Sequence, residues 1–169
     1  MAQKKAARKG RFLNIVTQKK KLPNGIVVTV EMVKHPGAVV IIPFLSKNRL
    51  ILLRQFRPVI NAYIYELPAG TLEKKEVPAA CARREIQEET GYAAKKITRL
   101  GAIYPVPGYS TEKISLFAAE GLTPVAVCCE EDEVIDPQVF TRAQIKKLFR
   151  AGKIVDAKTI CGLVMCGWL

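Results

Sequence analysis

The 23 residues Gly70 to Tyr92 read GTLEKKEVPAACARREIQEETGY and contain most of the information in the chain. Five residues separate Gly70 from Glu76, and seven separate Glu76 from Arg84. Pro78 suits the first turn of a helix, where a missing N–H costs nothing. Gly91 suits the left-handed residue just past a helix end. The stretch therefore predicts a glycine turn, a short loop and a helix.

Three carboxylates fall in one sector of the predicted helix. At about 100° per residue, Glu85 and Glu89 lie about 40° apart, and Glu88 lies about 60° to the other side of Glu85. We expect the buried stripe on a different side, formed by Ala79, Ala82 and Ile86. Crowded carboxylates repel one another, and a hard cation such as Mg²⁺ relieves this repulsion. The spacing predicts a divalent-cation site, whereas an isolated acidic run would indicate only a solvated helix face.

Position by position, the stretch resembles the signature box of the Nudix hydrolases, which cut diphosphates linked to a nucleoside. The resemblance extends to nearly everything from His35 to the C-terminus. The flanking segments resemble those of the ADP-ribose pyrophosphatases: RQFRP at 54–58, YELPAG at 65–70, YPVPGYSTE at 104–112, EEDEVI at 130–135 and GKIVDAKT at 152–159. The lysines before Glu76 and the closing Tyr92 are local departures from the general box.

The resemblance implies roles for individual residues. Metal ligands would be Glu85, Glu89, Glu133 and the backbone carbonyl of Ala69, holding Mg²⁺ with Mn²⁺ as a possible substitute. Glu131 would be the base that activates water, with Glu88 as a rival, and Arg84 would brace the box through Glu76. Each substrate-binding candidate also has an ordinary structural interpretation. Arg57 would clamp the diphosphate or be a surface arginine, and Glu66 and Glu112 would lie near metal or substrate or be polar rim residues. Phe12 would stack on the base or belong to the core.

The rest of the chain predicts one domain of ordinary size. Of 169 residues with net charge +12, positions 1–22 carry eight lysines and arginines and no acid. We expect residues 1–11 to be a basic, flexible arm, with RNA or an anionic surface as the alternative partner, and residues 12–169 to be a single domain. The chain has no secretory-type apolar stretch and no run of the roughly 18 apolar residues that span a membrane. Five cysteines without CxxC spacing, and a single histidine, indicate reduced thiols and the cytoplasm.

The predicted elements alternate between strands and helices. Asn24-Gly25 predicts a hairpin between strands near 12–18 and 26–33. Further strands are expected at 39–44, 49–56, 64–67, 97–104 and 113–119, with an acidic loop at 130–133. Helices are expected from a Thr141–Gln144 capping box to Gly152, and from an Asp156 cap over 157–168. This order fits an α/β fold, a Nudix-type α/β/α sandwich with a mixed sheet and an N-terminal antiparallel hairpin.

The function that the resemblance implies is Mg²⁺-dependent cleavage of ADP-ribose, or of a related nucleoside diphosphate sugar, into AMP and ribose 5-phosphate. The alternatives are hydrolysis of GDP-mannose or another nucleoside diphosphate sugar, an RNA 5′-end pyrophosphohydrolase suggested by the basic arm, and a noncatalytic nucleotide sensor. A small-molecule substrate and a homodimer that exchanges strands 12–33 are the expected partners, without membrane or nucleic acid.

Overall fold

The computed structural model describes residues 14–125 and 134–169. Within these ranges the strands are β1 (Ile15–Lys21), β2 (Val27–Val33), β3 (Ala38–Ser46), β4 (Arg49–Arg57), β5 (Ala62–Glu66), β6 (Ala69–Thr71), β7 (Tyr92–Ile103), β8 (Ile114–Pro124) and β9 (Ile135–Thr141). The helices are α1 (Pro78–Thr90), α2 (Arg142–Arg150) and α3 (Ala157–Met165). The predicted acidic loop at 130–133 lies outside the described residues.

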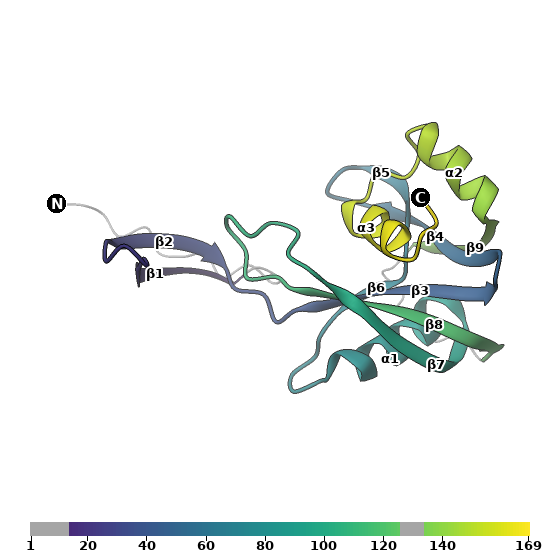
Figure 1. The fold of residues 1–169 in the computed structure, drawn as a ribbon, viewed down its shortest axis with the longest axis horizontal. Helices are drawn as coiled ribbons and strands as arrows, with labels where there is room; N and C mark the ends of the chain where they lie inside the picture. The colour runs from purple at the N-terminus through teal and green to yellow at the C-terminus, as the bar shows by residue number, and fades with distance from the viewer. Residues whose placement is uncertain (1–13, 126–133) are drawn as a thin grey trace.

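A mixed sheet with helices on both faces forms the body of the molecule (Figure 1). Its strand order is β5-β4-β3-β8-β7, with β6 also paired to β3 and β9 also paired to β4. Only β3 and β8 run parallel among these pairs; the other pairs are antiparallel. Helix α1 covers one face, and α2 and α3 cover the other. The predicted α/β/α sandwich with a mixed sheet is confirmed.

The middle strand β3 is buried on both faces, as its run of Val and Ile residues predicts. Val39 and Ile41 pack with Ala82 and Ile86 of α1. The alternate residues Val40 and Ile42 belong to the cluster that also contains residues of α2 and α3. Two hydrophobic cores therefore lie on opposite faces of β3. Both hold β3 in place, and with it the strands that pair with its edge.

The sheet divides along one edge of β3, and this division positions the site. The first residues of β3 pair with β6, whereas its last residues pair with β4. Between these two pairings, the Ile41 N–H donates to the carbonyl of Pro68 at 2.8 Å. The chain thus passes from β5 to β6 through Leu67 and Pro68, and leaves a gap between the part of the sheet that holds β4 and β5 and the part that holds β6.

Helix α1 begins and ends where the sequence predicts. Pro78 occupies its first turn, and Gly91 adopts φ 71° as the left-handed residue after the last turn. The expected buried stripe is partly wrong, because Ala79 is exposed and Cys81 is fully buried. The reason is that the carboxylates of Glu85 and Glu89 belong to the buried face themselves, which turns the first-turn alanine towards solvent.

Both C-terminal helices have the predicted N-caps. The Thr141–Gln144 capping box closes onto α2, and the Asp156 carboxylate accepts the Thr159 N–H at 2.9 Å. The last helix is shorter than expected, since α3 ends at Met165 and Trp168 packs into the core beyond it. Two strands were not predicted: β6, with three residues, and β9, which carries a proline that faces β4.

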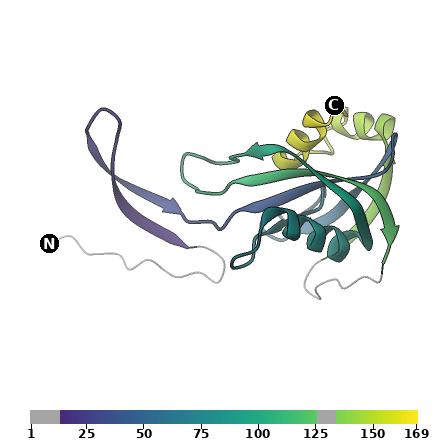
Figure 2. The same cartoon turned by 60° about the horizontal axis from the view of Figure 1, so that its bottom comes forward.

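The hairpin of β1 and β2 projects away from the body (Figures 1 and 2). Its turn is the predicted one, with Gly25 at φ 87° and the Asn24 side chain accepting the Ile26 N–H. The end of β2 is tied to the loop before β8, because Val33 exchanges backbone hydrogen bonds with Tyr109 and Thr111. Ile15, Ile26 and Val27 are exposed on the hairpin.

Candidate active site

Gly70 lies directly beneath the carboxylate of Glu85. A methyl group at position 70 would stand 1.8 Å from Oε1 and 1.9 Å from Cδ of that side chain. Gly70 is not in the left-handed region of backbone space, so the requirement for glycine is one of space rather than of conformation. The first glycine of the box therefore lets α1 approach β6 closely enough to place Glu85 over the strand.

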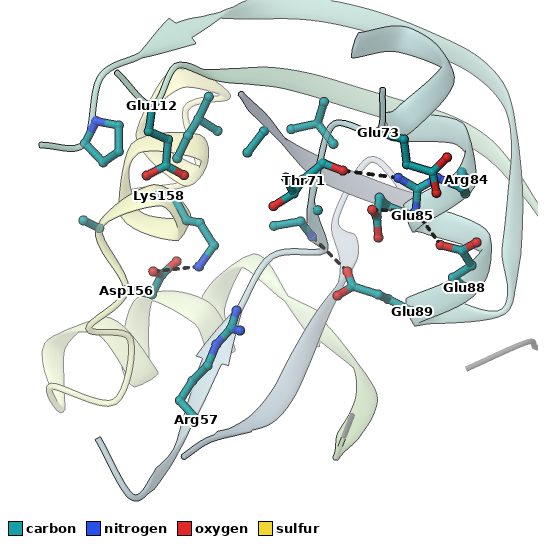
Figure 3. A pocket seen from close by; sticks show the side chains of 17 residues that line it. Arg57, Thr71, Glu73, Arg84, Glu85, Glu88, Glu89, Glu112, Asp156 and Lys158 are labelled. Carbon is teal, nitrogen blue, oxygen red and sulfur yellow. Dashed lines mark hydrogen bonds and ion pairs between the residues drawn. The ribbon is translucent and has the colours of Figure 1, made fainter. Parts of the chain in front are cut away.

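Arg84 connects the loop before α1 to the acidic face of the helix (Figure 3). Its Nε and one terminal nitrogen each donate to the Glu76 carboxylate at 3.1 Å. Its other terminal nitrogen lies 2.8 Å from Glu88 and 2.7 Å from Glu85. A planar guanidinium with five donors is suited to this work, which a lysine could not do. The geometry is that of the brace expected from the sequence.

Three groups in the box have shifted pKa values. The hydrogen bonds from Arg84, and next the Glu73 N–H, lower the pKa of Glu76 to about 2, so it stays charged. The same partners, Glu76 first, raise the pKa of Arg84. Burial, and then the neighbouring Glu76, raise the pKa of the Cys81 thiol to about 12, which makes this cysteine unreactive.

The carboxylates of Glu85 and Glu89 form one wall of the cleft. Both residues are buried, with 9% and 5% of their surface exposed, and Glu88 is more open. The Glu89 carboxylate accepts the backbone N–H of Ala69 at 2.8 Å, which ties the last turn of α1 to β6 (Figure 3). The expected ligand residues Ala69, Glu85 and Glu89 are thus brought together at one end of β6.

The opposite wall carries two cations that share one carboxylate. Glu66, at the end of β5, is 2% exposed. One of its oxygens accepts the Arg57 Nε at 2.7 Å, and the other accepts the Lys158 ammonium. Lys158 also donates to Asp156 at 2.9 Å. Arg57 and Lys158 line the cleft, whereas Glu66 is almost fully buried.

Glu112 comes from the loop before β8. Its backbone N–H donates to the Ser110 hydroxyl at 3.1 Å, and its carboxylate lies 4.0 Å from the His35 imidazole. The His35 backbone N–H in turn donates to Thr111. Glu112 lines the cleft on the same side as Lys158 (Figure 3). Its loop is therefore held at the mouth of the site by the end of β2.

Together these walls enclose a cleft of about 640 Å³, large enough for a nucleotide. Its carboxylate wall belongs to α1 and β6, and its cationic wall to β4 and α3. Of the predicted site residues, the cleft contains the following: Arg57, Ala69, Arg84, Glu85, Glu88, Glu89 and Glu112. Phe12, Glu131 and Glu133 lie outside the described residues.

The donor set at the carboxylate wall fits a hard divalent cation. Glu85 and Glu89 supply two buried carboxylates at the surface of the cleft, and oxygen is the donor that such cations prefer. In residues 14–125 and 134–169, no three His, Cys, Asp or Glu side chains converge into a metal site by themselves. The described part of the chain thus provides two of the carboxylates that a cation site would need.

Lys158 and Asp156 are two charged residues of the cleft to which the sequence assigned no role in the site. Both belong to the GKIVDAKT segment at 152–159, and Asp156 was predicted only as a helix cap. The available signal was a lysine in the first helical turn, where the helix dipole disfavours a positive charge.

A family model described as NUDIX domain matches residues 34–161, which is more than half of the chain. The chain belongs to the NUDIX domain family. The signature helix α1, the brace of Arg84 and the cleft beside them all lie inside the matched range. The predicted membership among the Nudix hydrolases, enzymes that cut phosphoric anhydride bonds, is confirmed.

Several relatives of this NUDIX protein are known. It is 39% identical over 152 residues to an ADP-ribose pyrophosphatase of Bacillus subtilis, covering 89% of this chain and 82% of the relative. It is 35% identical to a methanol dehydrogenase activator of Bacillus methanolicus, covering 89% and 83%. It is 33% identical to a GDP-mannose pyrophosphatase of Citrobacter koseri, covering 73% and 69%.

A solved structure described as an ADP compounds hydrolase has the same fold. It superposes with a TM-score of 0.81 at 22% identity, covering 95% of this chain and 87% of that structure. Among the described residues of the NUDIX protein, no helix is long and apolar enough to cross a membrane.

Proposed function

We propose that the protein hydrolyses the diphosphate bond of ADP-ribose, or of a related nucleoside diphosphate sugar, in a Mg²⁺-dependent reaction. ADP-ribose would give AMP and ribose 5-phosphate. The single observation that carries the proposal is the two-walled cleft, in which buried Glu85 and Glu89 face Arg57 and Lys158 across the space for a ligand. The similarity to an ADP-ribose pyrophosphatase supports the choice of substrate.

The resemblance to the Nudix hydrolases implies the roles of the individual residues. Glu85 and Glu89, with the Ala69 carbonyl and Glu133, would hold the divalent cation. When bound, that cation neutralises phosphate charge and acidifies a coordinated water. Arg57, oriented by Glu66, presents its terminal N–H groups to the diphosphate. Glu131 takes the proton from the attacking water, with Glu88 as the alternative base, and Glu112 contacts the ligand at the mouth of the cleft.

Oligomeric state and location form part of the same proposal. Residues 12–33 would reach a second copy, so that Phe12 of one protomer stacks on the base bound by the other, while residues 1–11 stay a flexible arm. The projecting β1–β2 hairpin with exposed Ile15, Ile26 and Val27 supports this arrangement. The cytoplasm is the proposed location, which the free thiols of Cys81, Cys161 and Cys166 support.

The test is a comparison of kcat/KM for ADP-ribose, ADP-glucose, GDP-mannose, UDP-glucose and 5′-triphosphorylated RNA, with products identified by chromatography. We expect ADP-ribose to exceed the others at least about tenfold, and chelation of the metal to abolish turnover. GDP-mannose as the best substrate would replace ADP-ribose in the proposal, and the similarity to a GDP-mannose pyrophosphatase makes it the second candidate.

A matched pair of variants tests the metal site. Glu85→Gln removes a buried carboxylate from the cleft and should lower kcat at least about a hundredfold. Glu120→Gln makes the same chemical change at the exposed Lys96 ion pair on β8 and should leave kcat unchanged. Equal activity of the two variants on the best substrate would refute the assignment of Glu85.

A further inference from the structure

Lys158 presents a charged group to the cleft, and this group is held more firmly than a surface lysine would be. Its side chain is 18% exposed, and its ammonium contacts Glu66 and Asp156. An ammonium group has three donors, so one N–H remains beyond these two partners. Lys158 and Asp156 line the cleft, whereas the second carboxylate that contacts Lys158, that of Glu66, is almost fully buried.

The shared carboxylate places Lys158 beside Arg57. The two cations contact different oxygens of Glu66, so both lie next to the same carboxylate on one wall of the cleft. Glu66 contacts both cations, and Asp156 contacts Lys158 through Oδ1 while its Oδ2 caps α3. A paired guanidinium and ammonium, facing buried carboxylates across a cleft, is an arrangement suited to phosphate oxygens.

A purely structural role for Lys158, in holding α3 to the β5–β6 corner, would duplicate contacts that other residues already make. The Thr159 side chain is fully buried and accepts the Leu67 N–H at 2.8 Å, which ties α3 to the β5–β6 corner without any charge. Asp156 caps the helix without needing a cation. A lysine in the first turn of α3 opposes the helix dipole, so it does not stabilise the helix.

We propose that Lys158 is a second phosphate-binding cation of the cleft, paired with Arg57 through Glu66, and that it contacts nucleotide phosphate oxygens on the side away from Glu85 and Glu89. Glu66 is then a positioning residue for both cations rather than a contact of the substrate. The inference deepens the proposed function and rests on it, since it takes a nucleotide as the ligand.

The test compares two uncharged variants with a charge-preserving one and with a surface control. Lys158→Met removes charge and hydrogen bonds, Lys158→Gln keeps hydrogen-bond donors towards Glu66 and Asp156, and Lys158→Arg keeps the charge. Lys153→Met removes the same charge from an exposed position five residues earlier. Each protein is titrated calorimetrically with AMP and with adenosine in the presence of Mg²⁺, and is assayed on the best nucleotide sugar.

We expect both uncharged variants to weaken AMP binding and raise KM at least about tenfold, with adenosine affinity unchanged and kcat within about threefold. Lys158→Arg should stay within about threefold of the wild type, and Lys153→Met should match it. Unchanged AMP affinity in Lys158→Gln, or equal losses for AMP and adenosine, would overturn the inference.

The AMP titration separates this inference from the proposed function. A wild-type protein that hydrolyses none of the nucleotide sugars would refute the function, but its AMP titrations would still decide the role of Lys158. A wild type that does not bind AMP would overturn the inference outright. If Lys158→Met does not fold, Lys158→Gln carries the test alone.

Discussion

At the scale of single residues, the apposition of Gly70 and Glu85 is the most restrictive feature of the site. Gly70→Ala would force the Glu85 carboxylate away from β6, because the new methyl group overlaps it. Displacements of about 1 Å in an active site can cost about a hundredfold in rate. We expect a loss of that order in kcat/KM. The control is Gly108→Ala, where the added methyl group meets nothing within 4 Å; a loss in both variants would indicate general destabilisation.

Lys75 is the second residue whose backbone carries information. It directly precedes Glu76 and has φ 68°, in the left-handed region that favours glycine. A left-handed lysine costs about 1–2 kcal/mol, part of which glycine returns as unfolded-state entropy. Lys75→Gly should therefore raise Tm by a few degrees. Lys74→Gly, at a position without positive φ, should lower Tm or leave it unchanged. A Tm that rises in Lys74→Gly and falls in Lys75→Gly would contradict backbone strain at Lys75.

The ion pair of Glu76 and Arg84 predicts a pH dependence of stability. The pKa of Glu76 is lowered from 4.5 to about 2, so the folded state binds this proton less readily than the unfolded chain. The resulting stabilisation is complete above pH 4.5 and is lost as the pH falls towards 2. Denaturant titrations of the wild type and of Glu76→Gln, without metal, should differ most near neutral pH and converge in acid. A difference that does not shrink below pH 4.5 would exclude this origin.

At the scale of elements, one buried hydroxyl holds α3 to the corner between β5 and β6. Thr159→Val keeps the shape of the side chain but leaves the Leu67 N–H without its acceptor. An unsatisfied buried donor costs about 1–3 kcal/mol, which corresponds to a Tm several degrees lower. Thr159→Ser keeps the acceptor and loses only a methyl group. We expect its Tm to lie above that of Thr159→Val. The opposite order would show that the hydrogen bond between the Leu67 N–H and the Thr159 hydroxyl does not stabilise the fold.

Elements with a local signal were predicted well. Gly91, the Thr141 capping box and the Asp156 cap each satisfy backbone groups within a few residues, and Pro78 has no N–H that needs a partner in the first turn, so their positions can be read directly. The strand β6 has only three residues, and its existence depends on pairing with β3 far away in the sequence. The strand β9 contains Pro137, which discourages a strand assignment, yet the pairing with β4 prevails.

In the candidate site, too, residues with a local signal could be predicted, and residues whose role depends on distant contacts could not. The carboxylates on α1 could be predicted because four residues of helix place them on one side. Lys158 could not, because its role depends on Glu66, which is 92 residues earlier. The burial of Glu85 and Glu89 was also hidden, since a carboxylate in a sequence indicates solvent unless its surroundings are known.

At the scale of the whole molecule, the β1–β2 hairpin leads to a prediction about assembly. A two-stranded hairpin that projects from the body has little to stabilise it alone. If it packs on a second copy, light scattering should give the mass of a dimer. Val27→Asp places a charge on the exposed apolar surface of the hairpin and should yield monomers. Thr17→Asp, which adds the same charge at a polar position on the neighbouring strand, is the control and should leave the mass unchanged. A monomeric wild type would remove strand exchange from the proposal.

The two walls of the cleft belong to different parts of a divided sheet, and this has a consequence for turnover. A ligand with two linked phosphates can touch both walls at once, so both contribute to holding it. On the proposed function, cutting the bond between the phosphates would leave two fragments that carry one phosphate each. In that reaction, cleavage would therefore loosen the hold of the cleft on its ligand and favour release of the products.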